Sequence, residues 1–220
     1  MATTQTAVST RGRLFVRPTW TRGIGSWLTT VDHKRLGILY IVSAFIFMGA
    51  AATEAFIMRL QLLTPNMNVV NPDQFNQLFT MHGVTMVFLA IMPLGIGLAN
   101  YFVPLQIGAR DLAFPRLNAF GYWVYAFGGL MIYSSWFLGG APDMGWVAYA
   151  PLTSLSHNPG LGVDFYMFGL FISGIGTTGT AMNLIVTIVS MRAPGMTMMR
   201  VPVFAWMMLI TSFMIIFAFP

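Results

Sequence analysis

The sequence predicts an all-α fold: a polytopic bundle of transmembrane helices with about five spans and a cytoplasmic amino terminus. The 220 residues are 56% hydrophobic and only 8% charged, which is typical of a membrane protein. A spanning helix needs about 20 mostly apolar residues, and in lipid only helices and closed barrels satisfy every backbone polar group. The apolar runs are too long and unbroken for barrel strands. The chain has no cysteine, which excludes disulfides and thiolate metal sites.

The predicted spans are 36–58, 79–105, 119–138, 162–190 and 203–220. Basic residues set their orientation, because cationic loops stay in the cytoplasm. Most of them lie before the first span, between the second and third, or between the fourth and fifth: Arg11, Arg13, Arg17, Arg22, Lys34, Arg35, Arg110, Arg116, Arg192 and Arg200. Arg59 alone falls on the other side of the membrane. Loops 59–78 and 139–161 are therefore outside. The net charge of +5 reports topology and argues against a nucleic-acid partner.

Two regions divide the chain: a predicted cytoplasmic tail, 1–26, and a membrane domain, 27–220. Residues 1–24 contain Arg and Thr but no acidic residue, which also fits an organellar targeting segment; a tail is the simpler interpretation. The fifth span stops at Pro220 with no polar residue after it. We therefore expect a truncated membrane domain, the amino-terminal part of a longer protein.

One ionisable side chain, His82, lies inside the second span, about one turn from its outer end. Its helical neighbours are largely apolar, and burial favours the neutral imidazole, which is the form that binds a metal. Gly83 would let a flat, bulky group approach the backbone. The alternative is a neutral histidine hydrogen-bonded to another helix, and the residues alone leave both open. His33 and His157 lie outside the spans. A haem iron held by two imidazoles, or a copper site of three histidines, would therefore need residues from outside this chain.

A short inner connection, QIGARDLAFPRLN at 106–118, contains Asp111. One interpretation is a loop carboxylate paired with Arg110 or Arg116. The other is a proton-uptake point at the mouth of a hydrated path lined by amides such as Asn100 and Asn118. Asp111 and the histidine of the second span lie near opposite faces of the membrane, an arrangement that suits a proton pump.

Other polar residues in the spans have simpler explanations. Glu54 and Asp164 lie near span ends, where pairing or capping is the default. The segment SGIGTTGT, which contains Thr177, makes a small, hydroxyl-rich helix face that favours close packing between helices.

Five motifs, taken together and in order, resemble subunit I of the haem-copper terminal oxidases, of the bacterial cytochrome c oxidase type. They are VDHKRLGILY, FTMHGVTMVF, NYFVPLQIGARDLAFPRLN, GGAPDMGWVAYAPL and MRAPGMTMMRVPVFAW, and the likeness runs from about Trp27 to Pro220. The resemblance implies a twelve-helix core holding a low-spin haem and a binuclear centre of high-spin haem and copper. There oxygen is reduced to water and protons are pumped across the bacterial plasma membrane.

The resemblance also implies roles for particular residues. His82 matches an axial ligand of the low-spin haem, Arg59 the arginine that hydrogen-bonds a haem substituent, and Trp146 the tryptophan near the haem propionates. Asp111 matches the entrance of the D-type proton channel; its polar lining is matched by Asn100, Asn118, Asn183 and Thr177. The remaining haem and copper ligands belong to later helices, so this chain alone is not expected to catalyse.

The electron donor is predicted from positions at which this sequence differs from the quinol-oxidising members of the family that it resembles. Quinol-oxidising members use an arginine, an aspartate and a histidine around a quinone pocket, and the matching positions here are Ala50, Glu54 and Gln74; Gln77 would fit. We therefore expect cytochrome c as donor, through subunit II, with subunits II and III as partners. The alternatives are a quinol oxidase of the same family and a haem-free transporter or structural subunit. A transporter should show matching broken helices in two halves, and the sequence shows none.

Overall fold

The computed structural model describes residues 23–218. The chain divides into two units, Met1–Thr30 and Val31–Pro220, and each is considered by itself. The first unit contains one short described helix, α1 (Ile24–Leu28). The predicted cytoplasmic tail, 1–26, therefore lies largely outside the described residues.

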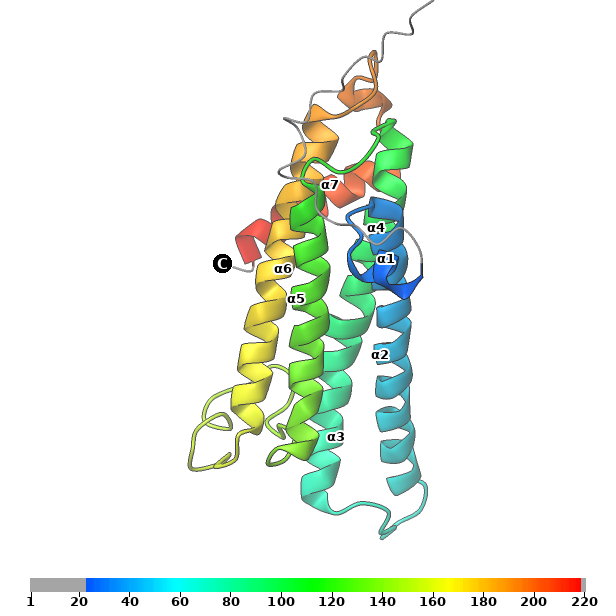
Figure 1. Cartoon of the computed structure of the whole chain (residues 1–220). Helices are drawn as coiled ribbons and strands as arrows, with labels where there is room; N and C mark the ends of the chain where they lie inside the picture. Colours follow the sequence, from blue (N-terminus) through cyan, green and yellow to red (C-terminus); the bar gives the residue numbers. More distant parts are fainter. Residues whose placement is uncertain (1–22, 219–220) are drawn as a thin grey trace, which may run out of the picture. The chain divides into compact units, whose positions relative to one another are not determined.

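The second unit is a bundle of long helices (Figure 1). Its lengthwise elements are α2 (His33–Gln61), α3 (Pro72–Val84), the π-helix η2 (Thr85–Ile91), α4 (Met92–Ile107), α5 (Pro115–Ser134) and α6 (Gly162–Ser190). Three stretches are long and apolar enough to cross a membrane: His33–Gln61, Pro72–Ile107 and Gly162–Ser190. The chain is a multi-pass helical membrane protein, which confirms the predicted fold class.

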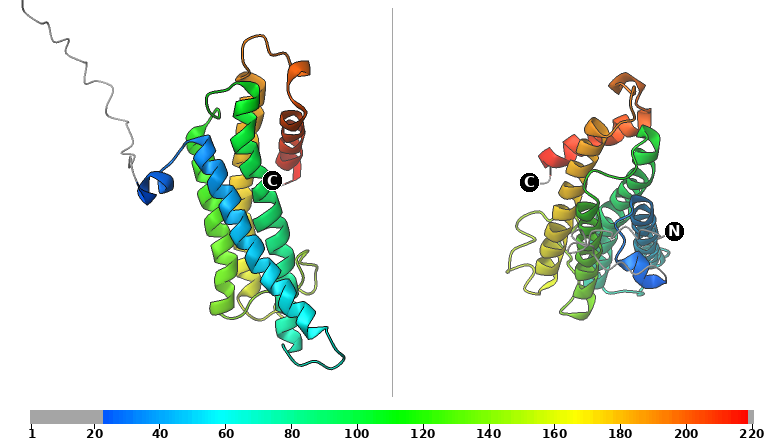
Figure 2. Two further views of the ribbon diagram at one scale, coloured as in Figure 1. Left: turned by 90° about the vertical axis from the view of Figure 1, so that its right-hand side faces the viewer. Right: turned by 45° about the horizontal axis from the view of Figure 1, so that its top comes forward.

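The third and fifth predicted spans differ in detail from the helices observed. The third is α5, which ends at Ser134 and continues as a short 3₁₀ turn, η3 (Ser135–Phe137). The fifth follows the 3₁₀ turn η4 (Met198–Arg200) and is α7 (Val203–Ala218), a shorter apolar helix. In Figures 1 and 2, α7 runs across α6 instead of alongside it.

The connections alternate between the two ends of the bundle, as the predicted topology requires. The loops 62–71 and 138–161 lie at one end in Figure 1, and the loops 108–114 and 191–202 lie at the other. The second end, which we call the inner end, carries the basic residues Lys34, Arg35, Arg110, Arg116, Arg192 and Arg200. Arg59, in the last turn of α2, lies at the opposite, outer end.

Local sequence signals fix where the helices start. The Asp32 carboxylate caps α2 by accepting from the backbone N–H groups of Lys34 and Arg35, each at 3.0 Å. At the start of α3, Asn71 and Gln74 form a reciprocal capping box. These caps satisfy backbone donors that the first helical turn leaves without a partner.

Glycines allow the helices to approach closely. A Cβ on Gly37 would lie 2.9 Å from the carbonyl oxygen of Gly97, so α2 and α4 touch backbone to backbone. Between α5 and α6, a Cβ on Gly128 would lie 2.6 Å from the Gly169 carbonyl oxygen, and one on Gly176 would lie 2.7 Å from that of Gly121. Such small-residue contacts are how membrane helices gain packing energy without a hydrophobic driving force.

The second predicted span contains a feature that its sequence did not indicate, the π-helix η2. Pro93 follows it and has no N–H to donate to the Leu89 carbonyl, four residues back. The hydroxyl of Tyr125, on α5, donates to that carbonyl at 2.8 Å and is buried. In a membrane interior such a replacement donor matters, because water is not there to supply one.

A second proline repeats this pattern closer to the inner end. Pro104, inside α4, leaves the Asn100 carbonyl without its usual donor. His33, in the first turn of α2, places its Nδ1 3.0 Å from that carbonyl oxygen, so Nδ1 carries the proton and donates. Each proline is therefore paired with a side chain from another helix.

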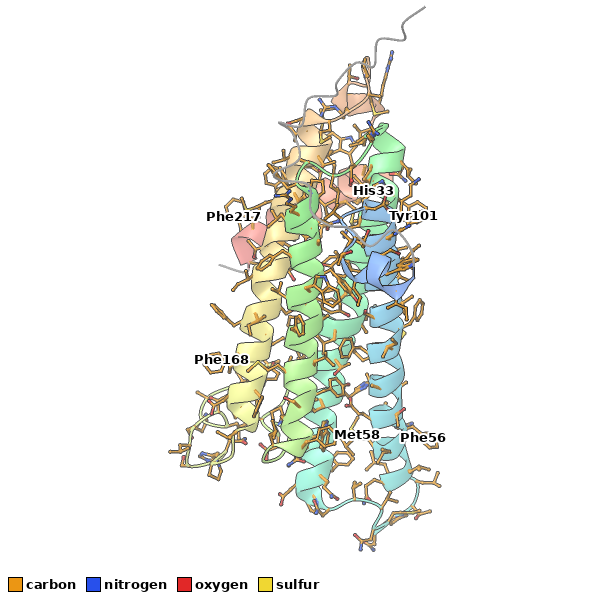
Figure 3. All side chains as sticks on the ribbon, viewed as in Figure 1. His33, Phe56, Met58, Tyr101, Phe168 and Phe217 are labelled. Atoms are coloured by element: carbon orange, nitrogen blue, oxygen red, sulfur yellow. The ribbon has the colours of Figure 1, made fainter. Side chains whose placement is uncertain are left out.

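Large apolar side chains cover much of the outside of the bundle. Phe56 and Phe168, for example, point away from it in Figure 3 and are mostly exposed. Facing lipid, these side chains need no protein cover, so the exposed apolar surface agrees with a membrane location.

Candidate functional site

The imidazole of His82 is held in one orientation by α2. Its Nδ1 lies 2.9 Å from the backbone carbonyl oxygen of Ala51, so Nδ1 is the protonated nitrogen and Nε2 keeps its lone pair. Metal-binding histidines typically donate their other ring N–H to a carbonyl or a carboxylate in this way. The half-buried ring therefore fits an axial haem ligand that acts through Nε2.

Trp146 packs against the residue next to His82. A Cβ on Gly83 would lie 2.8 Å from Cδ1 of the indole, so the flat group that approaches Gly83 in this structure is Trp146. The loop is fixed there because the Gly145 N–H donates to Thr80 Oγ1 at 2.9 Å, and the Tyr166 hydroxyl donates to the Trp146 carbonyl. The structure thus places Trp146 against Gly83, next in sequence to the histidine.

Arg59 lies apart from these groups. It is eight residues beyond Ala51 on α2, a rise of about 12 Å along the helix, and its side chain is exposed. Its predicted role is to hydrogen-bond a haem substituent. The structure shows no contact for it that defines this role.

A polar cluster that the sequence did not indicate lies beside His82. Glu54 is 7% exposed, its Oε2 has no hydrogen-bond partner among the described residues, and its carboxyl interacts with the Tyr133 hydroxyl. That hydroxyl lies 2.9 Å from Thr85 Oγ1, one turn beyond His82. The expectation for Glu54 was pairing or capping near the span end, yet the side chain turns into the bundle.

Unsatisfied amides mark the inner half of the bundle. Asn100 and Asn118 are fully buried, and in both side chains the nitrogen and the oxygen lack a hydrogen-bond partner among the described residues. Gln106 Oε1 is a buried atom that also lacks a hydrogen-bond partner among the described residues. Buried polar groups are normally satisfied by protein or by ordered water, so these amides indicate hydrated space.

Asp111 lies half-buried beside the first turn of α2. Its Oδ1 accepts from the Leu112 N–H at 2.7 Å, and the carboxyl also accepts from the backbone N–H of His33. Burial raises the pKa of this carboxyl above its ordinary value; the two hydrogen bonds and the nearby His33 partly oppose the rise, and Asp32 adds to it. The side chains that act on Asp111 electrostatically are thus Asp32 and His33, at the start of α2, and neither Arg110 nor Arg116 is among them.

Asn183 and Thr177 differ from the unsatisfied amides. The Asn183 amide donates to the Phe114 carbonyl at 3.1 Å and accepts from the Phe114 N–H at 2.9 Å, which fixes the loop before α5. The Thr177 hydroxyl donates to the Ser173 carbonyl at 3.0 Å on its own helix. Thr177 also lines an apolar groove of about 720 Å³ between α5 and α6. Both residues therefore have a structural partner in this conformation.

These features define a class: a multi-pass membrane protein with an anchored imidazole near one end of its helix bundle and unsatisfied buried amides near the other. The chain belongs to the family described as cytochrome c and quinol oxidase polypeptide I, whose model matches residues 35–220.

Curated relatives carry both activities in their names. The chain is 52% identical to a cytochrome c oxidase subunit 1 of Bacillus sp. (strain PS3) over 203 residues, which is 90% of this chain and 33% of the relative. It is 54% identical to the same subunit of Alkalihalophilus pseudofirmus over 89% of this chain and 31% of the relative. A quinol oxidase subunit 1 of Bacillus subtilis (strain 168) is 48% identical over 88% of this chain and 30% of the relative. The chain thus spans about a third of the length of these relatives.

Proposed function

We propose that this chain is the amino-terminal part of the catalytic subunit of a proton-pumping respiratory oxidase in the bacterial plasma membrane. In the complete complex, electrons from cytochrome c enter through subunit II and reduce oxygen to water, and subunit III is a further partner. Membership of the oxidase family supports this proposal. The high-spin haem and the copper are held by residues that this chain does not supply.

The single observation that carries the proposal is the bond between His82 Nδ1 and the Ala51 carbonyl. It fixes the ring and leaves Nε2 for the iron of a low-spin haem, which when bound supplies one-electron transfer. Trp146, packed on Gly83, contributes an indole beside this position, and Arg59 provides a cation at the outer end of α2 for a haem substituent.

Proton uptake is assigned to the inner end. Asp111 collects protons at the surface, and burial keeps part of its population protonated closer to neutral pH than an ordinary aspartate. Water held by Asn100 and Asn118 then carries the proton along the bundle. Asn183 and Thr177 complete the lining of this proposed proton path. Asn183 does so by fixing the loop that contains Phe114.

The second candidate is a quinol oxidase, because a relative of that name is 48% identical. Two observations favour cytochrome c. Gln74, at a position where quinol oxidases use a histidine, is engaged in the capping box with Asn71. Glu54 turns toward Tyr133 inside the bundle. Comparing reduced cytochrome c with quinol as donor to the purified complex separates the two candidates.

The test of the proposed function is His82→Ala in the complete complex. We expect loss of the low-spin haem absorption and of its share of the haem content. His157→Ala is the matched control, since that histidine lies in the exposed outer loop and, within the part of the chain that the structure describes, its ring bonds to the neighbouring serines. Retention of the low-spin signal in His82→Ala contradicts the assignment, and a complex without any haem absorption would instead favour a transporter or a structural subunit.

A further inference from the structure

The π-helix η2 joins the two candidate sites on one continuous helix. His82 lies three residues before η2, and Asn100 lies nine residues after it. Because an α-helix completes a turn in about 3.6 residues, one extra residue in a turn rotates all that follows by about 100°. The register of η2 therefore sets the direction in which His82 points relative to Asn100.

Tyr125 holds this register through a single bond. Its side chain is 3% exposed, and its hydroxyl donates to the Leu89 carbonyl that Pro93 leaves free. Gly129, one turn further along α5, lies in the same close contact, since a Cβ there would be 2.7 Å from Phe47 Cζ and 3.1 Å from Leu89 Cδ2. The phenol is thus a buried side-chain donor to the carbonyl that has no N–H from Pro93.

Two further contacts fix the segment from His82 to Leu89. His82 is bonded to the Ala51 carbonyl on α2, and Thr85 Oγ1 lies 2.9 Å from the Tyr133 hydroxyl on α5. With Tyr125 at Leu89, the segment is held at three successive points. The first of these contacts orients the ring directly, and the other two orient the helix that carries it.

We propose that Tyr125 is a positioning residue for His82, which it orients by holding the register of η2 through the Leu89 carbonyl. The proposal rests on the proposed role of His82 as a haem ligand. A phenol that only filled space in the bundle would tolerate replacement by phenylalanine without any change at His82. A phenol that holds the register would not.

The experiment is Tyr125→Phe in the purified complete complex, read by electron paramagnetic resonance of the oxidised low-spin haem. The g-values of such a haem depend on the orientation of its axial imidazoles, so we expect them to shift while the haem content is retained. We also expect amide hydrogen exchange over residues 86–92 to accelerate by about tenfold, as one buried hydrogen bond is lost. Tyr122→Phe is the matched control, because that hydroxyl pairs with Ser43 at 2.9 Å and does not contact η2.

A second pair of variants tests the proposal even if Tyr125→Phe fails to assemble. Pro93→Ala restores a backbone N–H near Leu89, so removing the Tyr125 hydroxyl should then have no further effect. Different g-values in Pro93→Ala and in Pro93→Ala/Tyr125→Phe overturn the proposal, and identical values support it only together with a shift between wild type and Tyr125→Phe or faster exchange in that variant. Wild-type g-values and exchange rates in Tyr125→Phe alone also overturn it, whereas a low-spin signal that persists in His82→Ala contradicts the proposed function itself.

Discussion

Two polar groups of the bundle, one near each end, differ in how they are partnered. Near the outer end, the His82 ring is bonded to the Ala51 carbonyl. Near the inner end, the side-chain amides of Asn100 and Asn118 have no hydrogen-bond partner among the described residues. A ring that has to keep one orientation needs a fixed partner, whereas a proton path needs groups that water can join. On this view, the site at His82 is rigid, and the amides at the inner end face water.

The largest effect is expected at the mouth of the hydrated end. Asp111→Asn removes the carboxyl to which the proposed function assigns proton uptake and leaves an amide of similar shape. We expect proton pumping to be suppressed and turnover to fall on the order of tenfold or more, measured with the complex in sealed vesicles. The low-spin haem spectrum should stay unchanged. Unimpaired pumping would show that protons enter elsewhere.

The next effect compares two buried asparagines. Asn118→Leu removes two unsatisfied polar atoms and closes hydrated space, so proton uptake should slow severalfold while stability is unchanged or increased. Asn183→Ala instead removes both bonds to Phe114 and should lower the free energy of unfolding by about 1–3 kcal/mol.

The measurements are proton uptake after rapid oxidation and thermal unfolding of the detergent-solubilised complex. If Asn118→Leu destabilised the complex as much as Asn183→Ala, its amide would have a partner, and the division into rigid and hydrated parts would be wrong.

The smallest effect is a pH dependence of stability. The folded pKa of Asp111 is raised by burial, so between the ordinary and the raised pKa the folded state binds more protons than the unfolded state. The stabilisation that protonated Asp111 gives the folded state is fully present below the ordinary pKa and is lost as pH rises through the folded pKa. The stability of Asp111→Asn relative to wild type should therefore increase from about pH 4 toward neutrality.

Thermal unfolding at several pH values tests this expectation. The control is Asp73→Asn, because that carboxylate is exposed at the start of α3. A difference between Asp111→Asn and wild type that stays constant with pH would show that burial does not act on Asp111 as described.

Hydropathy and charge predicted much of the fold. Long apolar runs placed the helices, since hydropathy is a local signal, and the orientation drawn from the basic residues stays a prediction. The π-helix was missed because a uniformly apolar run has no periodicity that reveals one extra residue in a turn. Pro93 was the available signal, because a proline inside an apolar span frees a carbonyl.

For the candidate site, the sequence identified His82 and Asp111 but not what fixes them. The bond from His82 to Ala51 spans 31 residues of sequence, and the bonds from Asn183 to Phe114 span 69. Spacing along a single helix cannot reveal such pairs. Glu54 was expected to pair near the surface, and only the arrangement of α2 against α5 shows that it turns toward Tyr133.

The glycine contacts between α5 and α6 have a consequence for biogenesis. Among the described residues, α6 is apolar enough to cross a membrane by itself, whereas α5 does not fall in that group. Backbone contact through Gly121, Gly128, Gly169 and Gly176 gives α5 a partner of suitable shape. We expect the translocon to release the two helices as a hairpin, with α6 carrying α5 into the bilayer.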